Sequence, residues 1–189
     1  MKLESIDLFT KIDLKKDILS GTWKFAGGAL AGTGVRNNYA RLNTTYSPPE
    51  EYDISVIVER REAGGEQPGM HVIFVGGGKQ VDFAIETAGA VSGVSGLDGK
   101  PVWDTPLGLP GANFLPKGEK KNLLFMVRKE GIVVQLEGKD WYTWKAEWNR
   151  IPSGGNAVAG AAKAVIGFGF DMTTGAIHKA VIMAPKEKQ

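Results

Sequence analysis

Short runs of alternating apolar and polar residues, separated by glycine-containing turns, constrain the fold of this chain more than any other feature. The run YDISVIVERR (52–61) alternates with the period of two that a half-buried β-strand requires. The runs MHVIFV and QVDFAIE flank a GGGK turn, which predicts a β-hairpin with one apolar face and one wet face. The stretch NLLFMVRKEGIVVQLEGKDWYTWKA predicts three strands joined by KEG and EGK turns, each with a glycine where positive φ is expected.

The remaining segments complete an all-β pattern. We expect strands at 23–25, 29–32 and 40–43, and a final pair formed by AVIGFGFD and AIHKAVIMAP around MTTG. Glycine accounts for 26 of 189 residues, about twice its usual share, which suits many strands joined by tight turns. The sequence therefore predicts an all-β fold, a two-sheet antiparallel β-sandwich of about ten to twelve strands, in a single domain spanning residues 1–189.

Helical patterns are scarce in this sequence. Only two segments could hold a helical turn or two: Ser5–Leu19, within an N-terminal segment (1–19) that we expect to pack on the sandwich, and Ala157–Ala162. Two further segments, Ala88–Lys121 and Asn149–Lys163, are rich in Gly, Pro and Ser and read as long irregular loops. Loops of that length are usually functional or disordered, so the first is a candidate for ligand binding.

Composition excludes several classes of function. The 23 basic residues are interspersed with 21 acidic ones, which leaves no basic face suited to nucleic acid, and no apolar run approaches the roughly 18 residues needed for membrane insertion. The chain has no cysteine, which rules out disulfides, thiolate metal sites and cysteine nucleophiles. The N-terminus lacks the apolar region of a signal peptide, so we expect a cytoplasmic protein, or an extracellular or cell-envelope protein if a signal was removed.

The order of several motifs resembles that of a known superfamily. The motifs are, in order, SGTWKFAGGAL, ARLNTTYSPPEEYDISVIVER, GGGKQVDFAIE, SGLDGKP and VRKEGIVVQLEGK, with a Trp-Lys shortly after. In this order they resemble bacterial LamG-like jelly-roll domains of the concanavalin A-like lectin/glucanase superfamily. The likeness covers residues 20–185, nearly the whole chain. It implies a jelly-roll sandwich in which one curved sheet offers a concave face. Because the superfamily includes sugar-binding modules, lectins and glycoside hydrolases, it also implies a carbohydrate ligand.

The sequence departs from the hydrolases of that superfamily. Their two glutamates flank an aspartate on one strand, and nothing here matches this pattern. Asp82 and Glu86 share a strand face, but residues two and four positions apart on a strand are separated by about 7 and 13 Å. A retaining pair needs carboxyl groups about 5 to 5.5 Å apart. Because the chain also lacks a G-x-S-x-G elbow, we predict no catalytic residues.

Aromatic residues are the first candidates for sugar contact. The stretch GKDWYTWKAEWNR places three tryptophans in eight residues. Since Trp144 matches a tryptophan of the resembling domains, we expect it and Tyr142 to pack inside, leaving Trp141 and Trp148 exposed or at an edge. An exposed ring can stack on a pyranose, although a protein contact would look the same. Trp103, beside Asp104 in the long loop, is the best single candidate, with anchoring of that loop as the alternative.

A polar strand face is the second candidate. If the strands lie side by side, one face carries planar and charged side chains that can pair with sugar hydroxyls, and the alternative is a merely solvated face. The residues concerned are Glu59, His71, Gln80, Asp82 and Arg128. His71 and His178 lack partners at metal-ligand spacing, so no transition-metal site is expected. Calcium stays open as a cofactor, because carbonyls of SGVSGLDGK could join Asp98 as oxygen ligands.

These observations leave three functions open. The leading hypothesis is a non-catalytic, lectin-like module that binds polysaccharide or a glycosylated surface through the concave sheet face and the long loop. The second is a saccharide-active enzyme that uses chemistry other than the usual glucanase carboxylates. The third is a structural or assembly domain, in which Trp103, Trp141 or Trp148 is buried in a homo-oligomer or against a partner protein.

Overall fold

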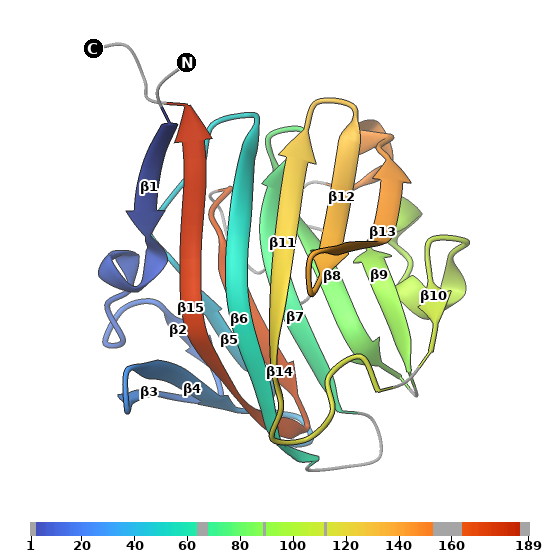
Figure 1. The fold of residues 1–189 in the computed structure, drawn as a ribbon. Coiled ribbons are helices and arrows are strands. Elements are labelled where there is room, and N and C mark those ends of the chain that lie inside the picture. Colours follow the sequence, from blue (N-terminus) through green and yellow to red (C-terminus); the bar gives the residue numbers. More distant parts are fainter. Residues whose placement is uncertain (1–2, 64–67, 89, 112, 153–163, 186–189) are drawn as a thin grey trace.

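The fold is a β-sandwich of two antiparallel sheets (Figure 1). The computed structural model describes residues 3–63, 68–88, 90–111, 113–152 and 164–185. Sheet A has the strand order β13-β12-β11-β6-β15-β4-β3, with β1 also paired to β15. Its strands are β1 (Leu3–Asp7), β3 (Thr22–Ala26), β4 (Ala29–Thr33), β6 (Tyr52–Ala63), β11 (Lys120–Arg128), β12 (Gly131–Leu136), β13 (Lys139–Lys145) and β15 (Thr173–Pro185).

Sheet B lies behind sheet A in Figure 1 and has the order β10-β9-β8-β7-β14-β5-β2. Its strands are β2 (Ile18–Ser20), β5 (Ala40–Asn43), β7 (Gly69–Gly76), β8 (Lys79–Thr87), β9 (Val91–Ser95), β10 (Leu109–Pro110) and β14 (Gly167–Asp171). The helical elements among the described residues are short 3₁₀ turns: η1 (Leu8–Lys11), η2 (Leu97–Gly99), η3 (Val102–Asp104) and η4 (Trp148–Arg150). None of the helices in the described ranges is long and apolar enough to span a membrane.

The core lies between the sheets and follows the alternation of the strands. Ile54, Val56 and Val58 of β6 are fully buried against the apolar face of the β7–β8 hairpin, which contributes Phe74 and Phe83. Such burial contributes about 1.5 to 3 kcal/mol for each large side chain.

Tyr52 adds a polar link across this core. Its hydroxyl group donates to the carbonyl of Val75 at 2.8 Å and accepts from the Val75 amide at 2.7 Å. Burial raises the pKa of Tyr52. The phenol therefore joins β6 of sheet A to β7 of sheet B while its ring fills the core.

The expected hairpin and three-stranded meander are both confirmed. Strands β7 and β8 pair from Met70–Ile85 to Gly76–Lys79, which leaves Gly77 and Gly78 as a two-residue turn with φ of 58° and 74°. Strands β11, β12 and β13 pair in sequence order. The three opening strands lie where the sequence indicated, at β3, β4 and β5.

Two local predictions were wrong, and a third is confirmed in part. Ser5–Leu19 does contain one helical turn, η1, in which Leu8 is buried, but its two ends belong to strands β1 and β2, and β1 pairs with β15. Strands β14 and β15 do not pair, since the turn at Met172 carries the chain from sheet B to sheet A. The segment Ala88–Lys121 is not wholly irregular, because it contains strand β9 and the short strand β10. The helical turn expected at Ala157–Ala162 lies outside the described residues.

The GGGK turn is shaped by Trp148. A Cβ on Gly77 would lie 2.5 Å from the Trp148 Cβ, whereas a Cβ on Gly78 would meet nothing within 4 Å. The indole lies over the turn, and its Nε1 donates to the carbonyl of Lys129 at 2.7 Å. Both turn glycines have positive φ, so a substitution at either strains the backbone, but only one of them also meets a side chain.

This geometry predicts unequal effects of two alanine substitutions. We expect Gly78→Ala to lower the free energy of unfolding by about 1 kcal/mol, the cost of a left-handed residue. Gly77→Ala adds the displacement of Trp148 and should cost about 3 kcal/mol. Urea denaturation monitored by tryptophan fluorescence measures both. Equal losses for the two variants would contradict the packing of Trp148 on the turn.

Candidate functional site

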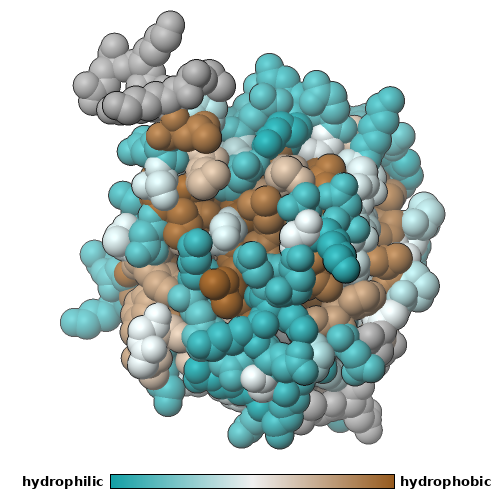
Figure 2. Space-filling model, viewed as in Figure 1, coloured by the Kyte–Doolittle hydropathy of each residue, from teal (hydrophilic) through white to brown (hydrophobic). Residues whose placement is uncertain are grey.

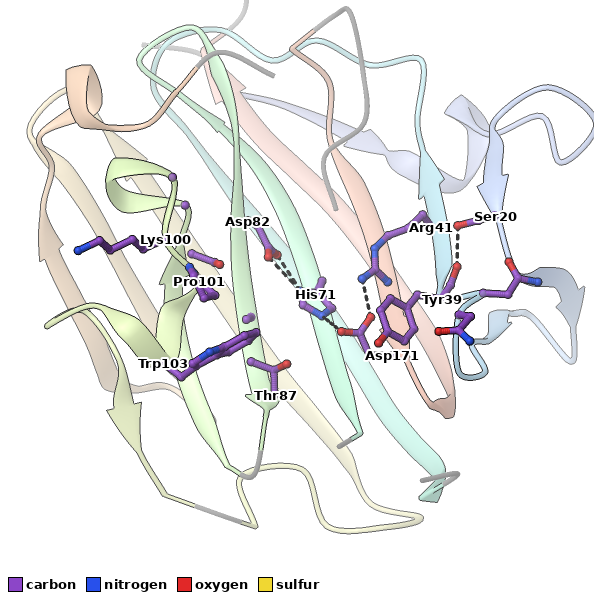
Figure 3. Close-up of a pocket in the computed structure, with 16 residues that line it drawn as sticks. Ser20, Tyr39, Arg41, His71, Asp82, Thr87, Lys100, Pro101, Trp103 and Asp171 are labelled. Carbon is purple, nitrogen blue, oxygen red and sulfur yellow. Dashed lines mark hydrogen bonds and ion pairs between the residues drawn. The ribbon is translucent and has the colours of Figure 1, made fainter. Parts of the chain in front are cut away.

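A pocket of about 540 Å³ lies on the outer face of sheet B (Figure 3). Its floor comes from four neighbouring strands, β8, β7, β14 and β5, which contribute one charged side chain each. We call these four residues the charge row: Asp82, His71, Asp171 and Arg41. One wall is the segment from Ser95 to Trp103, and the other contains Asn37, Asn38 and Tyr39.

Within the charge row, the charges alternate in sign across the strands. The His71 Nδ1 lies 2.9 and 3.1 Å from the two Asp82 oxygens, and its Nε2 lies 3.0 Å from Asp171 Oδ2. Arg41 Nη2 donates to Asp171 Oδ1 at 2.5 Å. A carboxylate accepts at each imidazole nitrogen, and only the protonated ring donates from both. His71 is therefore an imidazolium held between two carboxylates.

Gly169 makes room for this arrangement. It lies on β14 directly between His71 of β7 and Arg41 of β5 in the strand register. A Cβ at this position would lie 2.9 Å from Arg41 Nη1 and 3.2 Å from its Cζ. The guanidinium can therefore lie across β14 and reach Asp171 only because position 169 has no side chain.

The surroundings of His71 and Asp171 determine their ionisation. Burial alone would lower the pKa of His71, but the charges of Asp82 and Asp171 and their hydrogen bonds outweigh it and raise that pKa to about 9. Burial alone would raise the pKa of Asp171, but the charges and hydrogen bonds of His71 and Arg41 lower it to about 2. Both groups are therefore charged at neutral pH, and neither is poised for proton transfer there.

Two exposed aromatic rings flank the floor. Trp103 of η3 is 52% exposed on one side, and Tyr39 is 40% exposed on the other. Both are held by their neighbours: Val102 is fully buried beneath the η3 turn, and Ser20 Oγ donates to the Tyr39 carbonyl at 2.6 Å. The Arg41 guanidinium lies 5.4 Å from the centre of the Tyr39 ring. Two flat apolar surfaces thus border a polar floor.

The structure brings together only part of the predicted site. Trp103, His71 and Asp82 line this pocket. Asp104, next to Trp103, is exposed and is not among the lining residues. Gln80 lies on β8, but its Nε2 donates to Asn43 Oδ1 and to the Val165 carbonyl.

The shared polar face expected for five residues is wrong. Glu59 on β6 and Arg128 on β11 belong to sheet A, whereas the other three belong to sheet B. Glu59 pairs with His178 at 2.7 Å and with Arg61 at 3.1 Å, and Arg128 forms an ion pair with Asp53 at 2.8 Å. The wet face expected for the β7–β8 hairpin is also wrong, because His71 and Asp82 are only 3% and 1% exposed.

The tryptophans of the WYTWKAEW stretch pack against the sandwich. Tyr142 and Trp144 are buried, while Trp141 and Trp148 are half-buried. A bulge opposite Val134 and Gln135 breaks the strict alternation of β13, and Trp141 contacts the Phe83 and Phe114 rings. Trp148 packs on Trp144 and Phe74. Neither ring lines the pocket on sheet B.

Sequence reasoning missed most of the pocket lining, including Tyr39, Arg41 and Asp171. For Arg41 and Asp171, a signal was present in the strand period. In GFGFD the outward positions are Gly167, Gly169 and Asp171, and in ARLN an arginine interrupts an apolar strand. A charged residue between two buried apolar neighbours indicates a polar site on the outer face, but the neighbours that pair with it come from distant parts of the sequence.

In the SGVSGLDGK loop, which was considered for calcium, the Asp98 carboxylate is paired with Arg150. Asp98 Oδ1 and Oδ2 lie 3.1 and 2.5 Å from the Nε and Nη2 atoms of Arg150. This bidentate pair lowers the pKa of Asp98, with the hydrogen bond from Arg150 as the largest cause. Across the described residues, no group of three or more His, Cys, Asp or Glu side chains is placed to hold a metal ion.

A second hollow, of about 360 Å³, lies on sheet A. Met126, Val133 and Trp144 supply apolar surface, and Arg128, Glu130 and Lys145 border it. Figure 2 shows the outer face of this sheet, where apolar patches are separated by hydrophilic side chains. The charged groups here lie at the border, whereas the sheet B pocket has a buried polar floor. We therefore take the sheet B pocket as the candidate site.

No family model matches the sequence, and no curated protein is significantly similar to it. Solved structures do share its fold, which is a jelly-roll sandwich of the galectin-like and lectin-like kind. A Bacillus subtilis protein of unknown function with a galectin-like fold has a TM-score of 0.66 and 12% identity, covering 97% of this chain and 96% of that chain.

Two further solved structures share this fold. The apo Crh5 transglycosylase has a TM-score of 0.64 and 10% identity, over 99% of this chain and 85% of that chain. The metal-free carbohydrate recognition domain of Emp46p has a TM-score of 0.62 and 12% identity, over 96% of this chain and 98% of that chain. At such low identity, these likenesses establish the fold alone.

The charge row predicts a specific dependence of stability on pH. An unfolded histidine has a pKa near 6.5, and the fold raises the pKa of His71 to about 9. The added stability is fully present below pH 6.5 and is lost as the pH rises through 9, a change of about 3 kcal/mol. We expect the free energy of unfolding of the native protein, minus that of His71→Gln, to shrink across this window. A constant difference between pH 6 and 10 would show that His71 is not held as an imidazolium.

Proposed function

We propose that this protein is a non-catalytic carbohydrate-binding module whose ligand site is the sheet B pocket. One observation carries the proposal: two exposed aromatic rings, Trp103 and Tyr39, border a largely buried floor of paired charges in a hollow of about 540 Å³. A sugar ring offers an apolar C–H face and a rim of hydroxyl groups. Aromatic rings complement the first, and a charged polar floor complements the second.

Other facts are consistent with this proposal. The neighbours in fold include a carbohydrate recognition domain and a transglycosylase. The resemblance in sequence motifs leads to the same ligand class, and we propose that the chain is a LamG-like member of the concanavalin A-like superfamily. We take residues 1–189 as one domain, in which β1 and β2 attach the N-terminal segment to the two sheets.

The chemistry of the floor favours binding over catalysis. A glycoside hydrolase of the common type needs one carboxyl group that is protonated at working pH and can donate its proton to the leaving group. Asp171 has its pKa lowered to about 2, and His71, with a pKa near 9, cannot accept a proton at neutral pH. The enzyme hypothesis is therefore the weaker of the two for this pocket.

The assembly hypothesis is weakened by the positions of the tryptophans. Within the chain, the Trp141 ring packs on Phe83 and the Trp148 ring packs on Phe74. Among the three tryptophans considered for an interface, Trp103 alone remains largely exposed, and it faces the pocket. The other two rings are half-buried, so only part of each is available to an interface.

Binding should depend on Trp103. We expect Trp103→Ala to weaken binding by about ten-fold or more, because one aromatic platform is removed. The measurement is affinity electrophoresis in a gel that contains a polysaccharide shown to retard the native protein. The matched control is Phe25→Ala, which removes a ring that is 44% exposed on β3 of sheet A, outside the pocket. A screen of plant, fungal and bacterial polysaccharides should show retention without release of reducing sugar. Equal weakening by both variants, or no retention by any polysaccharide, would refute the proposal.

A further inference from the structure

We propose that the pocket selects an uncharged saccharide, and that Asp171 anchors it by accepting hydrogen bonds from two adjacent hydroxyl groups. The inference rests on the proposed function, because it names the ligand class of the same site. Two observations support it: the cations of the charge row donate their hydrogen bonds to protein acceptors, and Asp171 is the member of the row most exposed to the pocket.

The cationic members of the charge row are committed to the protein. Both ring nitrogens of His71 point to carboxylates. Arg41 Nη1 donates to the carbonyls of Ala40 and Phe170, and Nη2 donates to Asp171. The side chains of His71 and Arg41 are only 4% and 7% exposed. An anionic ligand would need charge-assisted donors from the floor, but both ring nitrogens of His71 and both terminal nitrogens of Arg41 already donate to protein acceptors.

The carboxylate of Asp171 is the most open charged group of the salt-bridged floor. Its side chain is 13% exposed, against 7% for Arg41 and 4% for His71. A carboxylate offers about four lone-pair directions on two oxygens, and the described residues use one on each oxygen of Asp171. One acceptor direction on each oxygen remains for a ligand. Two hydroxyl groups on neighbouring sugar carbons can donate to the two oxygens of one carboxylate.

The ionisation of Asp171 determines which ligands are rejected. Its flanking cations keep this carboxylate ionised throughout the physiological range. A uronate, sulfate or phosphate group placed over it would put two negative charges together in a partly buried site, where water screens them poorly. Lys100 also lines the pocket, but it is exposed at the rim, where solvent and salt screen its attraction for an anion. The floor as a whole carries no net charge, because its two cations offset its two carboxylates, but the group most open to the pocket is the Asp171 carboxylate. An anion seated there meets an acceptor and gains no donor from the less exposed His71 and Arg41.

Matched polymers test this selectivity on the unaltered protein. β-1,4-Mannan and β-1,4-polymannuronate, or β-1,4-glucan and β-1,4-polyglucuronate, share their linkage and differ chiefly in whether C6 is a hydroxymethyl or a carboxylate group. Among the pairs that contain a ligand, we expect calorimetry to show binding at least about ten-fold tighter for the neutral member. Its affinity should change less than about two-fold between low salt and 0.5 M NaCl.

The outcomes separate the two proposals. Equal or tighter binding of a uronate polymer, weakened by salt, would overturn the selectivity while leaving carbohydrate binding intact. Absence of binding to every neutral and acidic polymer would overturn both.

A variant tests the anchor itself. Asp171→Asn replaces one acceptor oxygen with a donor amide, and we expect it to weaken neutral-polymer binding by about ten- to hundred-fold. Because this change also removes a partner of His71 and Arg41, thermal unfolding must first show a folded protein. Native affinity in a folded Asp171→Asn protein would refute the role of Asp171. If the variant does not fold, the polymer comparison on the native protein decides the proposal.

Discussion

The site depends on one interaction, the clamp of the protonated His71 ring between Asp82 and Asp171. Removing a charge from water costs several kcal/mol unless an opposite charge and hydrogen bonds replace the solvent. Here the four charges of the row alternate in sign, so that each has an opposite neighbour on the next strand. The row thereby holds β8, β7, β14 and β5 in register on a face that the hydrophobic core does not reach.

Stability alone does not explain why these strands carry charges. Apolar side chains of similar volume on the same face would often be as stable as a buried ion-pair network, or more so. A network held by the protein instead favours ligand binding. Its acceptors are already oriented, so the entropic cost of ordering them is not incurred when a ligand binds. The absence of a side chain at Gly169 is consistent with this role, because that position makes space for Arg41 and not for core packing.

The sequence predicted the architecture better than the site. Strand alternation is a local property, and it located the β7–β8 hairpin and the β11–β13 meander correctly. The assignment of strands to sheets is not local, and for this reason Glu59 and His71 were expected on one face although they lie on different sheets. The bulge in β13 similarly turned Trp141 toward Phe83, which strict alternation did not anticipate. Asp171 and Arg41 could be recognised as unusual residues, but their pairing across distant strands could not be read from the sequence.

The wall that carries Trp103 is anchored to both sheets. Strand β9 packs beside β8, and Gly93 permits the close approach of the Leu107 carbonyl and the Tyr142 ring. At the far end of the same segment, the buried Glu86 carboxylate accepts from the Leu115 amide at 3.2 Å and pairs with Arg60 of sheet A at 2.9 Å. The segment between these anchors is therefore held at both ends. Because a tryptophan side chain also has only two rotatable angles, Trp103 can offer its ring to a ligand with little loss of conformational entropy.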